Sequence, residues 1–371
     1  MRLLVTGGGT GGHIYPALSV VREMQRRHKD LEVLYVGTEL GMESDIVPKE
    51  GLPFATVSSR GFRRRISLDT LRTVAVASKG VWEARSVIRR FRPDVVLGTG
   101  GYVAGPVVLQ AALMGIPCLI HEQNALPSVT NRLLARFVKQ VALSFPEARQ
   151  YLPAKTRVIV TGNPVRPELF EATRGEGQRE LALDPRKKTL LVVGGSRGAE
   201  PINEAVLGML PNVMADATLQ LLFVTGSAHY EPTVERIRGQ GLNLEKAGNI
   251  IIKPYLYDMP LALAAADLII ARSGGMIAEI TAVGLPAILI PSPHVADNHQ
   301  EHNARAAEQA GVGLMIRENE LTPERLWRDC QQILTDEQRL LQMRQASLAY
   351  GKPQATDRIC NALEALARKK R

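Results

Sequence analysis

Cysteine is scarce in this chain. The 371 residues include three cysteines, Cys118, Cys330 and Cys360, which lie far apart and show no paired metal-ligand spacing. An odd number of widely spaced cysteines fits a reducing compartment. The sequence therefore predicts neither a disulfide framework nor a zinc site built on cysteine.

The usual holders of a nucleotide-bound metal ion are also missing. No Asp-x-Asp pair occurs, so a divalent ion on a nucleotide diphosphate has no obvious carboxylate ligands. No lysine followed by serine or threonine ends the first glycine run, which excludes a P-loop NTPase. The chain also lacks a repeat of fixed period, which argues against solenoids and coiled coils.

Long hydrophobic runs are absent or interrupted. The apolar run after Arg2 spans only residues 3–5 before Thr6 and the first glycines, which is too short for a signal peptide, and export is not expected. Residues 95–120 carry no formal charge, but glycines and prolines divide them into a strand, a turn, a helix and a second strand. This pattern is typical of a buried β-α-β unit and not of a membrane span.

The composition that remains is that of a globular protein with a basic balance. Hydrophobic residues make up 45% and charged residues 22%, and the length suits two domains. The net charge of +9 predicts an anionic partner: nucleic acid, lipid head groups or a phosphorylated metabolite. No helix-turn-helix, RNP or zinc-finger signature accompanies the basic residues, so nucleic acid is not expected.

Short apolar runs, each followed by a polar or glycine-rich turn and a helical stretch, recur along the chain. Five lie between residues 3 and 143, and the rhythm restarts at residues 189–193 and continues to residue 290. This pattern predicts an α/β fold of two doubly wound, Rossmann-like domains facing a cleft. The proline-bracketed segment 162–167 marks the boundary, and residues 173–178 are expected to form an exposed loop.

Glycine-rich loops follow three of the predicted strands, at residues 7–12, 98–102 and 194–199. Glycines let backbone N–H groups approach an anion at a helix N-terminus. Each loop alone could be only a tight turn, and the first formally fits a dinucleotide fingerprint with Glu39 as the ribose acid. Three such loops at the carboxyl ends of strands favour a ligand site.

Two later segments carry polar side chains toward the same predicted cleft. Glu279, one turn into a predicted helix, could accept hydrogen bonds from ribose hydroxyls or could be an ordinary surface carboxylate. Residues 291–303 combine three histidines with an Asp and a Glu, so zinc is an alternative. The spacing is not that of His-Glu-x-x-His or Cys-x-x-Cys sites, and the amides in this segment suit sugar hydroxyls better than metal.

The chain resembles the bacterial lipid II-forming N-acetylglucosaminyltransferases, the MurG family, from end to end. The motifs that carry the resemblance are Gly8-Gly9-Thr10-Gly11-Gly12-His13, Gly100-Gly101-Tyr102-Val103-Ala104-Gly105-Pro106, His121-Glu122-Gln123-Asn124, Gly162-Asn163-Pro164-Val165-Arg166, Gly194-Gly195-Ser196-Arg197-Gly198 and Asp297-Asn298-His299-Gln300. The resemblance implies a glycosyltransferase-B fold. It also implies inverting transfer of N-acetylglucosamine from UDP-GlcNAc to O4 of the muramoyl sugar of lipid I, without a cofactor.

The resemblance further implies an acceptor and membrane-facing domain at 1–163 and a donor-binding domain at 164–352. The C-terminal helix, 353–371, is expected to pack back on the first domain. Donor contacts are implied for the backbone of Leu256 on uracil, Glu279 on ribose, Ser196 and Arg166 near the diphosphate, Asn124 and Gln300 on the sugar hydroxyls, and Thr10, Gly11 and Gly12 in the first loop. Tyr102 is assigned to the acceptor side.

A membrane-bound acceptor would account for the positive charge. Phe62, Arg63, Arg64 and Arg65, followed by apolar residues up to Trp82, interleave basic and hydrophobic side chains. We expect this segment to dock on the anionic cytoplasmic face of the cell membrane, where other cell-wall synthesis proteins are possible partners. The alternative is a solvated arginine loop followed by an ordinary amphipathic core helix.

His13 is the candidate catalytic base. It ends the first glycine loop, and an unperturbed histidine has a pKa near the working pH. It could instead cap the helix or bind a phosphate. Two rival functions stay open: a UDP-N-acetylglucosamine 2-epimerase of the same fold, and a nucleotide-sugar-binding scaffold without turnover.

Overall fold

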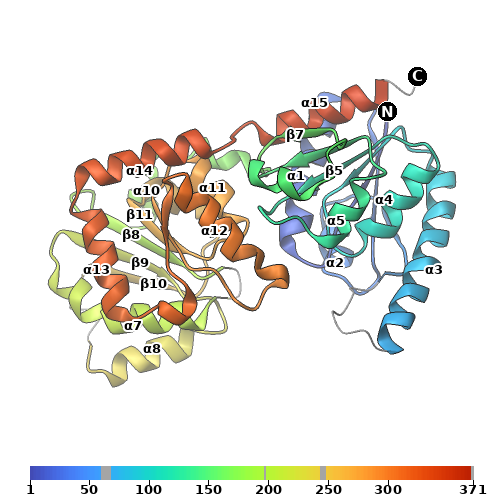
Figure 1. Cartoon of the computed structure of the whole chain (residues 1–371). Helices are drawn as coiled ribbons and strands as arrows, with labels where there is room; N and C mark the ends of the chain where they lie inside the picture. Colours follow the sequence, from blue (N-terminus) through green and yellow to red (C-terminus); the bar gives the residue numbers. More distant parts are fainter. Residues whose placement is uncertain (60–67, 196–197, 243–247, 369–371) are drawn as a thin grey trace. The chain divides into compact units, whose positions relative to one another are not determined.

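The computed structural model describes residues 1–59, 68–195, 198–242 and 248–368. The chain forms two compact units, unit 1 from Met1–Val165 with Lys352–Arg371, and unit 2 from Arg166–Gly351. Both ends of the chain lie in unit 1 (Figure 1). Unit 2 is therefore an insertion within unit 1, and the chain passes between the units twice.

Unit 1 is built on a parallel sheet of seven strands in the order β3-β2-β1-β4-β5-β6-β7. The strands are β1 (Arg2–Thr6), β2 (Glu32–Gly37), β3 (Phe54–Thr56), β4 (Val95–Gly98), β5 (Cys118–Glu122), β6 (Gln140–Leu143) and β7 (Val158–Val160). The helices are α1 (Gly11–Arg27), α2 (Glu43–Lys49), α3 (Leu68–Phe91), α4 (Ala104–Leu113), α5 (Val129–Leu134), the 3-10 helix η1 (Pro146–Tyr151) and α15 (Ala355–Arg368).

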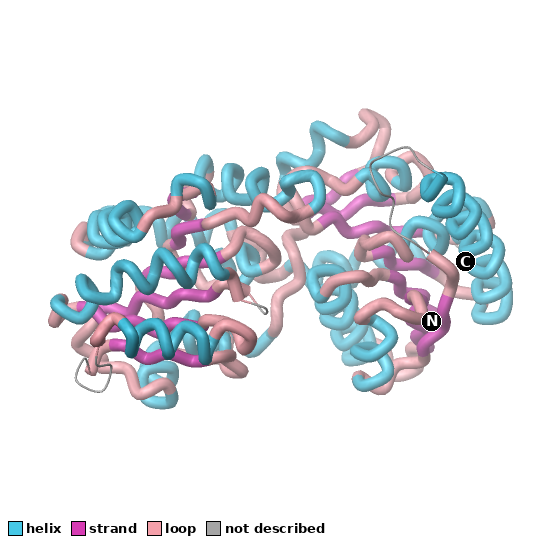
Figure 2. The backbone as a smooth tube through the Cα atoms, turned by 90° about the horizontal axis from the view of Figure 1, so that it is seen from below, coloured by secondary structure: helices cyan, strands magenta, loops and turns pink. Residues whose placement is uncertain are grey.

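Helices cover both faces of this sheet (Figure 2). Alternation along the buried central strand explains the two layers: Leu3 and Val5 pack with α1 and α15, whereas Leu4 packs with α4 on the other side. The helices that follow β1 and β4 thus diverge to opposite faces. The order of the strands reverses between these two, which is where open α/β sheets bind their ligands.

Unit 2 repeats this architecture with six parallel strands in the order β10-β9-β8-β11-β12-β13. The strands are β8 (Lys188–Val193), β9 (Leu219–Val224), β10 (Ile250–Lys253), β11 (Leu268–Ala271), β12 (Ala287–Leu289) and β13 (Gly313–Met315). The helices are η2 (Pro167–Leu169), α6 (Arg174–Glu180), α7 (Glu200–Ala215), α8 (Tyr230–Gly239), α10 (Met259–Ala265), α11 (Met276–Ala282), η3 (Ala296–Asn298), α12 (His299–Gln309), η4 (Glu318–Glu320), α13 (Pro323–Leu334) and α14 (Glu337–Tyr350). The prediction of two doubly wound α/β domains is confirmed.

One local prediction is wrong. Residues 173–178, expected as an exposed loop, begin helix α6. Thr173 and Glu176 form a capping box in which each side chain bonds the other's backbone N–H. Such reciprocal caps satisfy backbone donors of the first turn, and they start a helix that the glycines and charges of this segment conceal.

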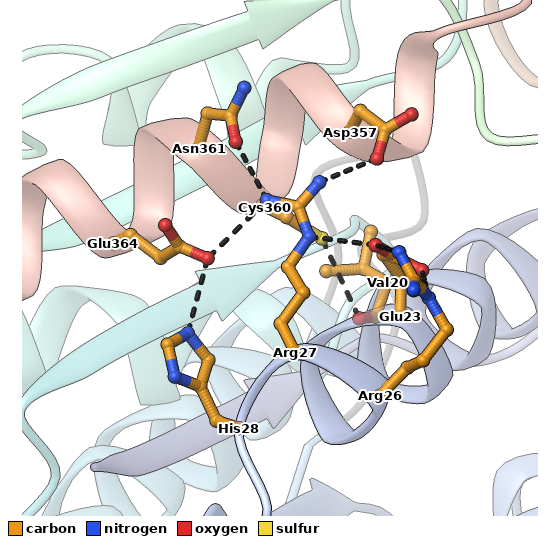
Figure 3. Close-up of polar contacts among 9 residues, drawn as sticks. All are labelled: Val20, Glu23, Arg26, Arg27, His28, Asp357, Cys360, Asn361 and Glu364. Carbon is orange, nitrogen blue, oxygen red and sulfur yellow. Dashed lines mark hydrogen bonds and ion pairs between the residues drawn. The ribbon is translucent and has the colours of Figure 1, made fainter.

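Helix α15 docks on α1 through a charged cluster on one face and apolar residues on the other (Figure 3). Arg27 of α1 donates to Asp357 at 2.5 Å, Asn361 at 2.6 Å and Glu364 at 3.3 Å, which lie on one face of α15. The apolar face of α15 buries Ile359, Cys360, Leu363 and Leu366 in the core of unit 1. These contacts make the last helix part of the first unit.

Among the described residues, no helix combines the length and hydropathy that crossing a bilayer requires.

Candidate functional site

Three loops of unit 1 meet where the strand order reverses. They follow β1, β4 and β5, and they carry His13, Thr99 and Gln123. The N–H of Gly8 donates to the carbonyl of Gly100 at 3.3 Å, which ties the first loop to the second. Gly101 has φ +80°, and a Cβ there would lie 2.2 Å from the oxygen of Gly8, so this close approach requires glycine.

His13 is half-buried in the first turn of α1, and its Nδ1 faces two partners. The carbonyl oxygen of Thr99 lies 3.0 Å from Nδ1, and Oε1 of Gln123 lies 3.3 Å from it. A carbonyl oxygen can only accept, so the neutral ring carries its proton on Nδ1. The other ring nitrogen, Nε2, is then unprotonated and able to accept a proton.

The pKa of His13 is lowered from its ordinary value, chiefly because burial disfavours the charged ring. The bonds to Thr99 and Gln123 and the carboxylate of Glu43 act in the opposite direction. His13 is therefore neutral at pH 7, which is the form a general base needs.

Glu43 is a buried carboxylate that no sequence motif singles out. It accepts hydrogen bonds from the N–H of Gly9 at 2.9 Å and from the N–H and hydroxyl of Thr38 at 3.0 and 2.7 Å. A Cβ at Gly8 would lie 2.3 Å from this carboxylate. The glycine loop thus surrounds a carboxylate supplied by the protein itself. In the sequence, the one sign of this role is an acidic residue among glycines after the second strand.

The remaining unit 1 candidates surround the same loop. Thr10 is the exposed N-cap of α1 and makes no side-chain cap bond, and Gly11 and Gly12 form the first turn. The ring of Tyr102 lies against Gly9, where an added Cβ would be 3.0 Å from Cε1. The structure therefore brings Thr10, His13 and Tyr102 to one loop cluster.

Asn124 is held at the end of β5 by a buried carboxylate. Glu122 accepts from the N–H and Nδ2 of Asn124 at 3.0 and 3.1 Å, and also from Ser128 and Asn131. Burial raises the pKa of Glu122, and these bonds oppose that rise. Glu122 therefore shapes the loop and takes up one amide donor of Asn124.

In unit 2, Arg166 and Glu279 are paired directly. Nε of Arg166 donates to Oε1 of Glu279 at 2.9 Å, with 47% of the arginine side chain and 14% of the glutamate side chain exposed. Burial raises the pKa of Glu279, whereas the guanidinium lowers it. The two residues predicted to hold the diphosphate and the ribose thus lie at hydrogen-bonding distance of each other.

Gln300 lies at the start of α12, after an unusual turn. Asp297 and Asn298 both have left-handed backbones, with φ +56° and +50°, a conformation that often marks a functional loop. Oε1 of Gln300 accepts from the N–H of Ser292 at 2.9 Å, and its Nε2 lies beside Gly274, where an added Cβ would be 3.7 Å away. Gln300, the residue predicted to bind sugar hydroxyls, therefore lies against the glycine turn after β11.

The other donor candidates are placed less directly. Leu256 is buried in the loop after β10. Its neighbours in the sequence, Tyr255 and Tyr257, are exposed, and the centroids of their rings are 4.9 Å apart. Ser196 lies outside the described residues, as do Phe62, Arg63, Arg64 and Arg65. Within the described part of the chain, no three histidine, cysteine, aspartate or glutamate side chains are grouped to hold a metal ion.

Several helices of unit 1 that follow the predicted membrane segment carry exposed apolar side chains. Trp82 on α3 is 75% exposed, Leu113 at the end of α4 is 64% exposed, and Leu133 and Phe137 lie on and just after α5. Helix α4 packs against both α3 and α5. Sequence periodicity alone did not distinguish these side chains from core residues.

Comparison with known proteins identifies both halves of the chain. Residues 3–143 match the glycosyltransferase family 28 N-terminal domain, and residues 189–359 match the glycosyltransferase family 28 C-terminal domain. Two relatives are named UDP-N-acetylglucosamine–N-acetylmuramyl-(pentapeptide) pyrophosphoryl-undecaprenol N-acetylglucosamine transferase. The one from Halalkalibacterium halodurans is 47% identical over 97% of this chain and 98% of its own. The one from Desulforamulus reducens is 46% identical over 98% of both chains.

Solved structures show the same fold. The crystal structure of MurG from Acinetobacter baumannii superposes with a TM-score of 0.79, at 29% identity over 98% of this chain and 99% of that one. A UDP-GlcNAc 2-epimerase from Neisseria meningitidis, bound to UDP-GlcNAc, has a TM-score of 0.66 at 18% identity over 98% of this chain and all of that one. The second likeness concerns the fold alone.

Proposed function

This chain belongs to glycosyltransferase family 28, and we propose that it transfers N-acetylglucosamine from UDP-GlcNAc to undecaprenyl-diphosphate-linked N-acetylmuramoyl-pentapeptide, giving lipid II. Relatives that are nearly half identical over almost the whole chain carry the name of this transferase. The solved structures titled UDP-N-acetylglucosamine 2-epimerase share less than a fifth of their residues with it. The transferase is therefore the better supported function.

The donor is held mainly by unit 2 in this proposal. Glu279 accepts hydrogen bonds from the ribose hydroxyls, Arg166 with Ser196 binds the diphosphate, and the backbone of Leu256 reads uracil. The 2.9 Å contact between Arg166 and Glu279 supports the first two roles, because ribose and diphosphate are adjacent in UDP. Gln300 in unit 2 and Asn124 in unit 1 are proposed to bind sugar hydroxyls, and Thr10, Gly11 and Gly12 of unit 1 are proposed as further donor contacts.

His13 acts as the general base. Its Nε2 takes the proton of the acceptor O4 hydroxyl while O4 forms a bond to C1 of the sugar. The bond between C1 and the phosphate oxygen breaks, and UDP leaves with the electron pair, so the anomeric configuration inverts. The proton on Nδ1, held toward the carbonyl of Thr99, supports this role because it leaves Nε2 free to accept.

A transfer assay separates the candidate functions. Radiolabelled UDP-GlcNAc is incubated with a lipid I analogue and, in parallel, without any acceptor. The transferase forms labelled disaccharide product only with the analogue, whereas an epimerase forms UDP-N-acetylmannosamine without it. A protein that binds UDP-GlcNAc and forms neither product is a scaffold.

The acceptor is anchored in lipid, so we also propose peripheral binding to the cytoplasmic face of the cell membrane. Leu133 and Phe137 are 54% and 52% exposed, and Arg136 and Lys139 beside them are exposed cations. Apolar side chains that insert at the interface, flanked by lysine and arginine, are typical of peripheral docking on anionic lipid. Phe62 to Arg65 lie outside the described residues, and we propose that they contribute to the same membrane binding.

A further inference from the structure

A chain of hydrogen bonds runs from Nδ1 of His13 into the interior of unit 1. Gln123 receives His13 at Oε1, 3.3 Å away, and its Nε2 lies 2.6 Å from the Thr99 carbonyl and 3.1 Å from Nδ1 of His121. His121 is fully buried, and its Nε2 lies 3.0 Å from the carbonyl oxygen of Gly162. Two histidines are thus joined through one amide.

The direction of every bond in this chain follows from its inner end. The carbonyl of Gly162 can only accept, so His121 carries its proton on Nε2 and accepts at Nδ1. Gln123 must then present its NH₂ group to His121 and to Thr99, because the reversed amide would place oxygen against two acceptors. Its Oε1 is left facing His13, whose Nδ1 must donate.

Burial keeps the inner histidine in the form that this ordering requires. The pKa of His121 is lowered to about 4, chiefly by burial and further by the nearby ring of His13, while the bond to Gly162 opposes the shift. A protonated His121 would donate at both nitrogens and would face the NH₂ group of Gln123 with a second donor. The titratable groups near His13 are the carboxylate of Glu43, which raises the pKa of His13, and His121, whose pKa is lowered.

We propose that Gln123 and His121 are positioning residues for the reaction, which order the protons so that His13 presents an unprotonated Nε2 to the acceptor. Neither residue needs to touch the substrate. The proposal rests on the proposed function only in what Nε2 is used for, and the tautomer itself can be observed without turnover.

The inner end of this hydrogen-bond chain is a residue whose backbone conformation is constrained. Gly162 has φ +87°, and a Cβ there would lie 2.3 Å from Cβ of Lys352. Only glycine fits this combination of a left-handed backbone and close packing. The residue whose carbonyl sets the proton order therefore packs against the segment that precedes α15.

The first test is ¹⁵N NMR of the full-length protein labelled at histidine, with the His13 signals identified through a His13→Gln variant. Neutral imidazoles with the proton on Nδ1 or on Nε2 have distinct nitrogen shifts. We expect His13 to carry its proton on Nδ1 and His121 on Nε2 at pH 7. Finding His13 protonated on Nε2 would overturn the proposal, whether or not transfer activity is detected.

The second test is Gln123→Met, which keeps the volume of the side chain and removes its hydrogen bonds. Thr99 still accepts from His13, so the form with the proton on Nδ1 should stay in the majority but be less strongly favoured. We expect kcat to fall by roughly 3- to 10-fold, the effect of one lost neutral hydrogen bond. The KM for UDP-GlcNAc should stay unchanged. The acidic limb of the kcat profile should move to lower pH, because the bond to Gln123 raises the pKa of His13.

Ser144→Ala is the matched control. Its hydroxyl lies 3.2 Å from Nε2 of His121, but a hydroxyl can donate or accept and so cannot order the protons. This variant should keep the His13 tautomer and the pH profile. Unchanged His13 shifts in Gln123→Met, or equal effects of the two variants, would refute the proposal.

Discussion

The contact between Arg166 and Glu279 allows the donor site to be dissected with ligands of different size. Replacing Arg166 with alanine removes a cation that, in the proposed function, binds the diphosphate of UDP. A charge-assisted hydrogen bond contributes about 1.5–3 kcal/mol, so UDP should bind roughly 10- to 150-fold more weakly. Uridine has no phosphate, and its affinity should not fall.

Breaking the contact between Arg166 and Glu279 should have an opposite effect on uridine, because it releases the carboxylate that binds the ribose. The arginine is nearly half exposed, and exposed ion pairs contribute about 0.2–1 kcal/mol, so releasing Glu279 could strengthen uridine binding by up to about 5-fold. Glu279→Gln should instead weaken uridine and UDP by similar factors, because both ligands carry the ribose. The control is Arg174→Ala, whose guanidinium pairs with Asp267 in the same unit and has no proposed donor contact.

Isothermal titration calorimetry of UDP, with uridine measured by competition at fixed ionic strength, yields the affinity of both ligands for wild type, for the two variants and for the control. If Arg166→Ala weakens the binding of uridine and of UDP by the same factor, then Arg166 acts only by holding Glu279. The assignment of Arg166 to the diphosphate is then wrong. If neither affinity changes, the pair lies outside the donor site.

Four further predictions concern catalysis, metal dependence, membrane binding and pH. His13→Ala should lower kcat by roughly 10²–10⁴-fold with little change in donor affinity by calorimetry, and a variant that loses donor binding but keeps kcat at saturation would exclude the base role. Transfer should persist after EDTA treatment, since Arg166 stabilises leaving UDP; full dependence on added magnesium would contradict this. Liposomes containing anionic lipid should bind Leu133→Ser/Phe137→Ser more weakly than wild type in a salt-sensitive manner, whereas Leu341→Ser, equally exposed on unit 2, should bind normally; equal binding of both would argue against the patch. His121 has a pKa of about 4 in the folded protein and about 6.5 in the unfolded chain, so below pH 6.5 protonation favours the unfolded chain. The free energy of unfolding should therefore decrease as the pH is lowered, by about 2 kcal/mol at about pH 5 from this group. If the denaturation midpoint of His121→Gln falls equally over this pH range, His121 is not the origin of the loss.

Strands of the sheet interiors could be predicted from the sequence because both of their faces are buried. The runs that contain β1, β4, β5, β8 and β11 are continuous and apolar for that reason. The sequence pattern does not predict β3, β7 and β13, which are three residues long and lie at sheet edges. Their residues are only partly buried, so the pattern that signals a strand is weak there.

The candidate site divides along a similar line. Glycine loops and His13 are visible in the sequence because special backbone conformations require particular residues. Glu43 is not visible, because its importance depends on burial beside Gly8 and Gly9, residues more than thirty positions away. The pairing of Arg166 with Glu279 likewise joins residues separated by 113 positions, and no local spacing can reveal it.

Helix α15 gives unit 1 an unusual relation to the order of synthesis. The ribosome makes all of unit 2 before it makes residues 352–371, although those residues fill part of the core beneath α1. Domains generally fold from the N-terminus onward during translation, but here the strands of unit 1 are made before unit 2 and α15 is made after it. Leu363 and Ile359 are fully buried in the finished protein, so the surface they cover on unit 1 stays open throughout the synthesis of unit 2. Unit 1 can therefore complete its core only after unit 2 has been synthesised, whereas unit 2 is continuous in the chain.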